Sequence, residues 1–351
     1  MLIVPGPIQR TGGYIYDCRM ADGLRALGWD VETLELSGSF PFPDTSARAR
    51  AMHVFNTLPD RAVALVDGLA LGAIPEVAER HAQRLRIIAL VHLPLSADVT
   101  REAATAQQLA ILESRALASA TLVVVTSDST VSMLDRYHLP RNRIVVIEPG
   151  TDRPTRDAPK RGGVGTSGRV IELLCVATIN SGKGHETLLQ SLAPIREPWH
   201  LTCAGSLTRD PATVTRVRGA IETLKLSDRV SLVGELDSRD LDQAYEHADV
   251  FVLATLQETY GMAVAEALGH GLPVVSTNTG AIGRLVGNRA GLIVEPDDIH
   301  GLSVALSTII RDESLRHALA DGARTAAQQL PTWDDAAARL SGVVTRLLNH
   351  G

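Results

Sequence analysis

The stretch Val250-Phe251-Val252-Leu253 predicts a buried strand. Shortly after it, Glu258-Thr259-Tyr260-Gly261-Met262-Ala263-Val264-Ala265-Glu266 predicts the start of a helix. Two carboxylates, Glu258 and Glu266, stand at the ends of the second stretch. If that stretch were fully helical, they would be roughly 12 Å apart. The acid pairs that hydrolyse glycosides are separated by about 5 to 9.5 Å. The spacing therefore favours two contacts to opposite ends of one elongated, hydroxyl-rich ligand, a shape that a nucleotide sugar has.

Short apolar runs alternate with helical patterns on both sides of this stretch, which is typical of parallel sheets covered by helices on both faces. In the first half, strands are predicted at residues 2–5, 31–36, 62–67, 86–91, 122–126 and 144–147. In the second half, they are predicted at residues 171–177, 199–204, 230–233, 250–253, 273–276 and 290–294. Helical patterns at 299–311, 313–329 and 333–349 end the chain.

The segment 153–169 interrupts this alternation, because it combines prolines, glycines and mixed charges without an apolar period. The chain of 351 residues also exceeds the size at which one core usually stops growing. We therefore expect an N-terminal Rossmann-like domain at 1–152, a linker at 153–169 and a C-terminal Rossmann-like domain at 170–332. The last segment, 333–351, is expected to return to the N-terminal domain.

Composition excludes several classes of protein. The net charge of −6 and the lack of a long Lys/Arg run argue against nucleic-acid binding. The opening apolar run is too short for a signal peptide, and no stretch is long enough to span a bilayer. Cys18, Cys175 and Cys203 form no C-x-x-C motif, so buried free thiols in a reducing cytoplasm are expected. Any membrane contact would be peripheral, at the apolar segment 40–42, although a turn packed on the core explains that segment more simply.

Distinctive residues follow the predicted strands at the ends where doubly wound sheets bind their ligands. In the first half these residues are His92, Ser127 and Pro149-Gly150. In the second half they are residues 178–183, Gly205-Ser206, Gly234-Glu235 and the stretch that ends at Glu258. Two such edges facing each other would define a cleft.

The stretch from Glu258 to Glu266, with Ala267-Leu268-Gly269-His270-Gly271-Leu272-Pro273-Val274-Val275 after it, resembles the E-x7-E motif and the next strand of the family 4 (GT4) retaining glycosyltransferases. The E-x7-E pattern alone is more often an amphipathic helix with exposed acids. The likeness continues in order through Thr11-Gly12-Gly13-Tyr14-Ile15-Tyr16-Asp17, Val91-His92-Leu93-Pro94-Leu95, Glu148-Pro149-Gly150-Thr151-Asp152 and Lys183-Gly184-His185. The resemblance implies an α/β protein of the GT-B fold, with two Rossmann-like doubly wound parallel-sheet domains facing a central cleft. It places the donor mainly on the second domain and the acceptor on the first.

Lys183 lies between a predicted strand and a predicted helix, where its ammonium group would neutralise a departing diphosphate. The simpler interpretation is a solvated loop lysine, and the P-loop spacing is missing. Enzymes that this chain resembles usually add an arginine five residues before the lysine or immediately before it. Thr178 and Gly182 occupy those positions here. This departure leaves open a weakened or inactive relative.

Gly12-Gly13 lies between the first predicted strand and helix, where backbone N–H groups can approach phosphate or substrate oxygens. From the dipeptide alone, a tight strand-to-helix turn is the favoured interpretation, and the dipeptide does not fit G-x-G-x-x-G. His92 stands at the end of a predicted buried strand. Although a lone histidine is more often structural, the resemblance implies that His92 orients the donor hexose.

The resemblance also assigns the remaining donor contacts. Glu266 would bind the donor ribose, and Glu258 would contact the transferred sugar together with the backbone of Thr259, Tyr260, Gly261 and Met262. Resembling enzymes commonly have glycine at the position of Thr259, so this loop is expected to be stiffer. Apart from the resemblance, further donor contacts are expected at Ser127, Gly205, Ser206 and Gly234, because these residues follow predicted strands, although glycine turns after strands are common.

No metal or cofactor is expected. Asp240-Leu241-Asp242 matches the D-x-D metal motif of another glycosyltransferase fold, but it opens a polar helical stretch where acids are ordinarily caps. No other carboxylate or Cys/His pattern calls for a catalytic metal.

Together these features predict a cytoplasmic, metal-independent glycosyltransferase that moves a hexose from a UDP- or GDP-sugar to an unidentified acceptor hydroxyl, with retained configuration. His92, Lys183 and Glu258 are the expected catalytic residues. Two alternatives stay open. One is another GT-B enzyme, such as a nucleotide-sugar epimerase or a phosphorylase. The other is a non-catalytic partner protein that has lost its phosphate contacts.

Overall fold

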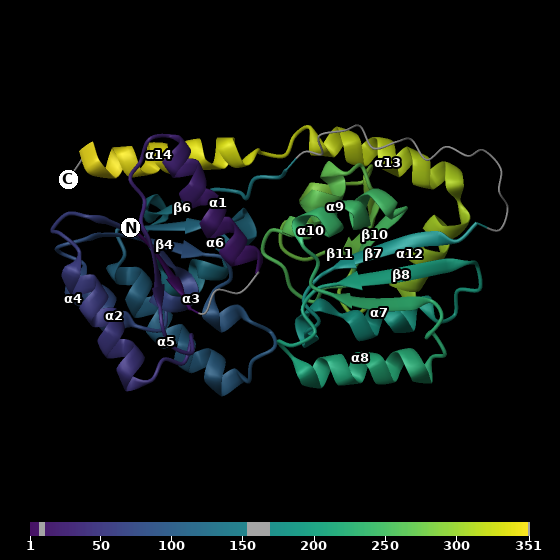
Figure 1. The fold of residues 1–351 in the computed structure, drawn as a ribbon, viewed down its shortest axis with the longest axis horizontal. Helices are drawn as coiled ribbons and strands as arrows, with labels where there is room; N and C mark the ends of the chain where they lie inside the picture. The colour runs from purple at the N-terminus through teal and green to yellow at the C-terminus, as the bar shows by residue number, and fades with distance from the viewer. Residues whose placement is uncertain (7–10, 153–168, 350–351) are drawn as a thin grey trace. The chain divides into compact units, whose positions relative to one another are not determined.

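The computed structural model describes residues 1–6, 11–152 and 169–349. These residues form two compact units, one of Met1–Gly150 with Pro331–Gly351 and one of Thr151–Leu330 (Figure 1). The predicted linker, 153–169, lies outside the described residues except for Arg169.

The first unit is built on a six-stranded parallel sheet of order β2-β1-β3-β4-β5-β6. Its strands are β1 (Leu2–Pro5), β2 (Thr33–Leu36), β3 (Val63–Asp67), β4 (Arg86–Val91), β5 (Leu122–Val125) and β6 (Ile144–Val146). Its helices are α1 (Gly12–Ala26), α2 (Thr45–Thr57), α3 (Gly68–Leu71), α4 (Pro75–His81), α5 (Ala103–Ser119), α6 (Asp128–Leu134) and α14 (Trp333–Asn349). Three short 3-10 helices, η1 (Leu95–Ala97), η2 (Asp135–Tyr137) and η3 (Arg141–Arg143), lie in its loops.

Strand β4 shows why this sheet is buried on both faces. Successive side chains of a strand point to opposite faces. Accordingly, Ile87 and Ala89 belong to one apolar cluster, which contains residues of α2, α4 and α5. Ile88 and Leu90 belong to the other, which contains residues of α1 and α14. A strand with two buried faces needs an unbroken apolar run. The sequence of β4 has such a run, which is why the strand could be predicted.

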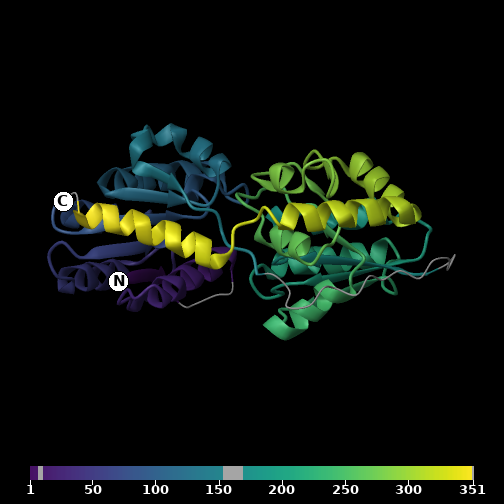
Figure 2. The same ribbon diagram turned by 90° about the horizontal axis from the view of Figure 1, so that it is seen from above.

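The C-terminal helix α14 packs against α1, and the two helices lie side by side in both views (Figures 1 and 2). A Cβ atom on Gly23 would come within 2.4 Å of the Ala337 Cβ, so glycine allows the close approach of the two helices. The indole N–H of Trp29 also donates to Ser341 Oγ at 2.9 Å. The last segment of the chain therefore belongs to the core of the first unit.

The second unit has a six-stranded parallel sheet of order β12-β11-β10-β7-β8-β9. Its strands are β7 (Ile171–Val176), β8 (Trp199–Ala204), β9 (Val230–Gly234), β10 (Val250–Leu253), β11 (Val274–Thr277) and β12 (Gly291–Val294). Its helices are α7 (His185–Leu192), α8 (Pro211–Thr223), α9 (Ser238–His247), α10 (Met262–Gly269), α11 (Ile282–Val286), α12 (Ile299–Arg311) and α13 (Glu313–Ala327), and η4 (Ser181–Lys183) precedes α7.

This second strand order is that of dinucleotide-binding Rossmann sheets, in which the chain leaves the central strand first to one side and then to the other. Here the reversal falls between β7 and β10. Each predicted strand is present, with ends shifted by at most two residues. The predicted pair of Rossmann-like doubly wound sheets is therefore confirmed.

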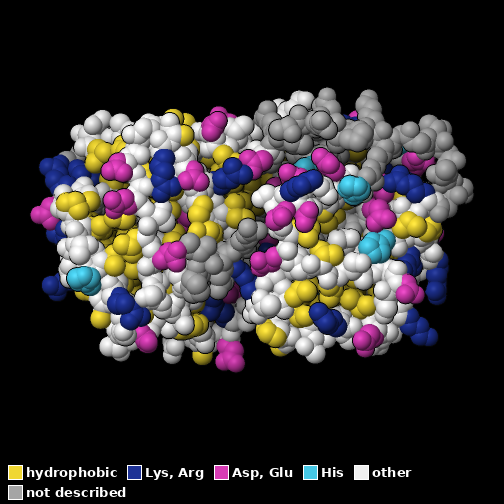
Figure 3. All heavy atoms as spheres, in the orientation of Figure 1, with side chains coloured by type: hydrophobic (Ala, Val, Ile, Leu, Met, Phe, Trp, Pro, Cys, Tyr) yellow, Lys and Arg dark blue, Asp and Glu magenta, His cyan; other side chains and the backbone are white. Residues whose placement is uncertain are grey.

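The surface carries charges of both signs. On the face drawn in Figure 3, basic and acidic side chains are interspersed rather than gathered by sign. Among the described helices, none combines the length and the apolar character that crossing a membrane requires. Cys175 and Cys203 are buried as expected, but Cys18 is only half-buried. The expectation was wrong for Cys18 because its position on α1 lies beside the buried stripe formed by Tyr16, Asp17, Met20 and Leu24.

Candidate functional site

Lys183 and Glu258 meet at the reversal point of the second sheet. Lys183 ends η4 in the loop after β7, and Glu258 lies in the loop after β10. The Lys183 ammonium donates a short hydrogen bond to Glu258 Oε1, and the two side chains are 25% and 18% exposed. Ligands of doubly wound sheets bind beyond the carboxyl ends of the strands, at this reversal point. The structure thus brings together two of the three predicted catalytic residues, which are far apart in sequence.

Backbone contacts hold the two loops to each other. The carbonyl of Gly182 accepts hydrogen bonds from the Leu256 N–H at 2.9 Å and from the Thr255 hydroxyl at 3.1 Å. Gly184 follows with φ of +63°, and a Cβ atom there would lie 1.9 Å from the Ala254 carbonyl oxygen. Only glycine fits this close approach. The position of Lys183 is therefore set by packed backbone rather than by a free loop.

The N-terminus of α10 opens into the same region. Gly261 precedes the helix with a left-handed backbone, and no side chain caps it. The first backbone N–H groups of a helix attract anions. Tyr260 is buried, and the Thr259 carbonyl already accepts a hydrogen bond from Ala281. Contacts from this loop to a ligand would therefore come from Glu258 and from the backbone N–H groups that lead into Met262.

Glu266 lies on α10, where a buried tyrosine orients it. The Tyr245 hydroxyl donates to Glu266 Oε2 at 2.9 Å, and it also lies 3.3 Å from the Ala263 carbonyl. The Tyr245 ring stacks on His270 at a centroid distance of 4.8 Å. The sequence did not single out Tyr245, because its contact with Glu266 depends on how the two helices pack in the folded unit.

The other predicted residues of the second unit form a neighbouring group. Gly205 follows β8 and donates its backbone N–H to the carbonyl of Gly234, at the end of β9. Ser206 is buried, and its hydroxyl lies 3.3 Å from that of Thr208. Asp210 lies farther along this loop, and contacts from Thr213, with a smaller contribution from the backbone of Ser181, lower the pKa of its carboxyl group. The loop after β8 thus adjoins the turn that carries Lys183.

His92 of the first unit points into a pair of buried aspartates. Its Nε2 lies 2.9 Å from Asp17 Oδ1 and 3.6 Å from Asp67 Oδ2. Its Nδ1 is buried without a hydrogen-bond partner among the described residues. The ring also packs edge-on against Tyr16, at 5.2 Å between centroids. A Cβ atom on Gly13 would lie 2.8 Å from His92 Cδ2, so this glycine leaves the space that the ring fills.

Burial dominates the electrostatics of this cluster. It raises the pKa of Asp17 to about 8. It also raises the pKa of Asp67 to about 7, with a further contribution from the charge of Asp17. Desolvation lowers the pKa of His92, against the opposing effect of Asp67. A pair of adjacent acids that are difficult to ionise together holds protons near neutral pH, so the cluster can keep a neutral imidazole fixed in one orientation.

The sequence did not single out Asp17, Asp67 or Glu113, which fixes the loop after His92. Asp17 lies within the quoted stretch after Thr11, and Asp67 ends a predicted strand. An acidic residue within a pattern that predicts burial was the signal that could have identified them. Glu113 is buried on α5 and accepts the Leu95 N–H at 3.0 and 2.9 Å and the Tyr137 hydroxyl. Burial raises the pKa of Glu113 to about 7.

Three predicted positions have local structural roles. Gly12 and Gly13 begin α1, and the hydroxyl of Thr11 caps this helix by accepting the Tyr14 N–H at 3.2 Å. Ser127 caps α6 and accepts the Thr130 N–H at 3.3 Å. These contacts account for the residue types at these positions. They do not test the predicted donor contacts, which stay predictions.

The D-x-D motif lies at the start of α9. Asp237 is the N-cap and accepts the Asp240 N–H at 2.9 Å, so Asp240 occupies the first turn. Within the described part of the chain, two other groups bring three metal-ligating side chains together: Asp17, Asp67 and His92, and Cys175, His185 and Cys203.

Part of the chain is similar in sequence to known proteins. Residues 160–326 match the family described as glycosyl transferases group 1. Mannosylfructose-phosphate synthase of Agrobacterium fabrum is 28% identical over 242 residues, which are 64% of this chain and 53% of that protein. A D-inositol 3-phosphate glycosyltransferase of Xylanimonas cellulosilytica is also 28% identical, over 64% of this chain and 57% of that protein. The match spans about half the length of these relatives.

Solved structures share the fold over nearly the whole chain. Sucrose-phosphate synthase from Thermosynechococcus elongatus superposes with a TM-score of 0.84 at 21% identity, covering 100% of this chain and 99% of that one. Anabaena Alr3699/HepE, in complex with UDP-glucose, gives 0.79 at 16% identity, covering 98% and 99%. At these identities the likeness establishes the fold alone.

Proposed function

We propose that this chain, whose residues 160–326 match the family described as glycosyl transferases group 1, is a retaining, metal-independent glycosyltransferase that moves a hexose from a UDP- or GDP-sugar to an acceptor hydroxyl. The observation that carries the proposal is the contact between Lys183 and Glu258 at the reversal point of the second sheet. The names of the relatives support the class of reaction. A neighbour of the same fold has been solved with UDP-glucose, which supports a nucleotide-sugar donor.

Donor binding begins with an exchange of partners at Lys183. The Lys183 ammonium is paired with Glu258 in the structure, and the diphosphate of the donor would take the place of this carboxylate. Backbone N–H groups at the start of α10 would add donors to the same phosphates. Glu258, released from the lysine, would accept hydrogen bonds from the hydroxyls of the hexose. The donor ribose would lie against Glu266, which Tyr245 orients.

In the transfer step, the bond from the anomeric carbon to the acceptor oxygen forms while the bond to the β-phosphate oxygen breaks. The acceptor hydroxyl gives its proton to an oxygen of the departing diphosphate. Negative charge grows on this group as the bond breaks, and Lys183 stabilises it. The resemblance to retaining enzymes implies attack from the face that the leaving group departs from, and such attack would retain the configuration without a covalent nucleophile.

The missing family arginine has a candidate substitute in Arg209. Arg209 lies in the loop after β8, next to Asp210, whose pKa is lowered by Thr213 and, to a smaller extent, by the backbone of Ser181 in the turn that carries Lys183. Desolvation lowers the pKa of Arg209, and Glu235 acts against this shift. We propose that Arg209 supplies the second cation to the diphosphate.

A second candidate function is a non-catalytic partner protein, favoured by Thr178 and Gly182 at the arginine positions. Gly182 is buried, and its carbonyl accepts the hydrogen bond of the Thr255 hydroxyl.

The test is calorimetric titration with UDP and GDP, followed by assays of sugar transfer from the matching nucleotide sugars. We expect one of the nucleotides to bind at micromolar to millimolar concentration, and Glu258→Ala to stop turnover while the fold, judged by circular dichroism, is retained. Binding of neither nucleotide at millimolar concentration would favour the partner protein. Unchanged turnover in Glu258→Ala would refute the assigned site.

A further inference from the structure

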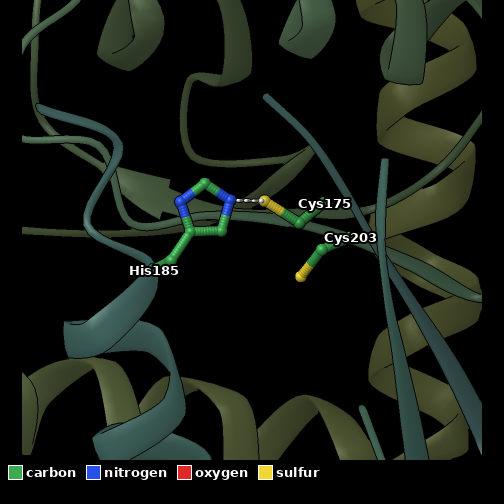
Figure 4. Close-up of side chains that lie close together, drawn as sticks. All are labelled: Cys175, His185 and Cys203. Carbon is green, nitrogen blue, oxygen red and sulfur yellow. Dashed lines mark hydrogen bonds between the residues drawn. The ribbon is translucent and has the colours of Figure 1, made fainter. Parts of the chain in front are cut away.

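Two cysteines and a histidine meet inside the second sheet. Cys175 of β7 and Cys203 of β8 are paired in register on neighbouring parallel strands, so their side chains point to the same face. His185 begins α7, and its ring turns toward the two thiols (Figure 4). All three residues are at most 3% exposed. No step of the proposed transfer uses them.

The spacing of the three side chains is close to that of metal ligands. The His185 Nε2 lies 3.8 Å from Cys175 Sγ, and the ligand atoms of all three residues lie within 4.8 Å of one another. Sulfur and nitrogen atoms bound to one tetrahedral zinc ion are roughly 3.6 Å apart, and two such sulfurs are roughly 3.8 Å apart, given Zn–S and Zn–N bonds of about 2.3 and 2.0 Å. Side-chain adjustments of less than about 1 Å would therefore bring the three ligand atoms to these separations.

We propose that Cys175, Cys203 and His185 bind one thiophilic d10 cation, and that this ion is Zn²⁺. Thiolate and imidazole ligands select such ions over magnesium or calcium. Two thiolates and a neutral imidazole around Zn²⁺ make a complex with no net charge, which suits a buried site. Binding releases the thiol protons of Cys175 and Cys203 that remain at the working pH, and it changes no oxidation state.

The affinity is expected to be moderate. Histidine ligands usually donate their second ring N–H to a neighbour, and loss of that contact typically weakens metal binding 10- to 100-fold. The His185 Nδ1 is buried without a hydrogen-bond partner in the described part of the chain. We therefore expect the ion to be removable by chelators, unlike that of a zinc finger. Because His185 stands two residues after Lys183, the ion would also fix the start of α7 beside the proposed donor site.

The test is equilibrium dialysis of the reduced, chelator-treated protein against Zn²⁺ until the metal content is constant. The wild type is compared with Cys175→Ala, Cys203→Ala and the matched control Cys18→Ala, which removes the half-buried thiol of the other unit. We expect the wild type and Cys18→Ala to hold one more zinc ion per chain than the two cluster variants. The wild type, loaded with Co²⁺, should show sulfur-to-metal charge-transfer absorption, a readout that needs no variant.

Equal zinc content in all four proteins, or no cobalt–sulfur absorption in the wild type, would overturn the proposal. The same dialysis with Cu⁺ under anaerobic conditions separates the two soft ions. Uptake of Cu⁺ without uptake of Zn²⁺ would overturn the assignment to zinc.

Discussion

The imidazole Nε2 of His92 lies 2.9 Å from the buried carboxylate of Asp17. This contact joins the end of β4 to the middle of α1, and Gly13, one helical turn before Asp17, makes room for the ring. His92 is therefore held by two positions, Gly13 and Asp17, that are distant from it in sequence. Its orientation can be disturbed without touching the histidine itself.

Gly13→Ala is expected to lower transfer activity by about 10- to 100-fold, since misplacement by about 1 Å at a reacting centre has an effect of this size. The new methyl group would meet His92 Cδ2 at 2.8 Å and Cγ at 3.0 Å, so the ring must move. Gly342→Ala is the matched control, because it is also a helical glycine of the first unit, and its nearest neighbour is Arg346 Nη1 at 3.8 Å. This control should keep full activity and gain about 0.5 to 1 kcal/mol in free energy of unfolding. Equal activity in the two variants would contradict the role of Gly13.

Asp17→Asn tests the buried acid pair through the pH dependence of stability. Burial raises the folded-state pKa of Asp17 to about 8, from an ordinary value of 3.8. Between these values the native state holds a proton that the unfolded state releases, so the free energy of unfolding falls as the pH rises toward 8. Asparagine removes this dependence. We therefore expect the stability of Asp17→Asn relative to the wild type to increase from pH 6.5 to pH 8.

Denaturant unfolding at these two pH values measures the effect. The raised pKa values of Asp67 and Glu113 also make the free energy of unfolding fall as the pH rises, and they do so in both proteins. The lowered pKa of His92 affects stability mainly below pH 6.5. Asp22→Asn is the control, because Asp22 is an exposed residue of the same helix, where it pairs with Arg25. A difference curve for Asp17→Asn as flat as that of Asp22→Asn would show that Asp17 is ionised in the folded protein.

The fold could be predicted from sequence because strands with two buried faces leave unbroken apolar runs between helical patterns. Lys183 and Glu258 could be proposed because each follows such a run. The partners of these residues could not be predicted. Asp17 and Tyr245 lie inside helices, and which side chains they meet depends on how each helix packs on its sheet. Cys175 and Cys203 were correctly expected to be buried, but their register across β7 and β8, and the approach of His185, exist only in the folded sheet.

Tyr245→Phe should weaken donor binding about 3- to 10-fold, since it removes one hydrogen bond worth about 0.5 to 1.5 kcal/mol. Tyr245 holds Glu266 Oε2 at 2.9 Å, and Glu266 is the proposed ribose contact. Steady-state kinetics should show a higher KM for the nucleotide sugar and an unchanged KM for the acceptor. An effect on the acceptor KM alone would place Glu266 away from the donor.

Arg209→Ala should weaken the binding of UDP or GDP about 10- to 100-fold, because a hydrogen bond to a charged group contributes about 1.5 to 3 kcal/mol. Arg218→Ala removes an exposed arginine of α8 and serves as the control. Calorimetry on both variants separates a specific diphosphate contact from a general loss of positive charge. If the two variants bind the nucleotide equally well, Arg209 does not replace the missing arginine.

Lys183→Met and Glu258→Gln should both stop turnover, but they should affect the binding of free UDP or GDP in opposite directions. Glu258 competes with the diphosphate for the Lys183 ammonium, because the two side chains are paired in the structure. Glutamine at position 258 removes this competitor, so the nucleotide should bind as tightly as to the wild type or more tightly. Methionine at position 183 removes the cation, so the nucleotide should bind more weakly. Calorimetric titration of both variants measures this difference, and equal weakening would mean that Glu258 itself supports the diphosphate, leaving the hexose without its proposed partner.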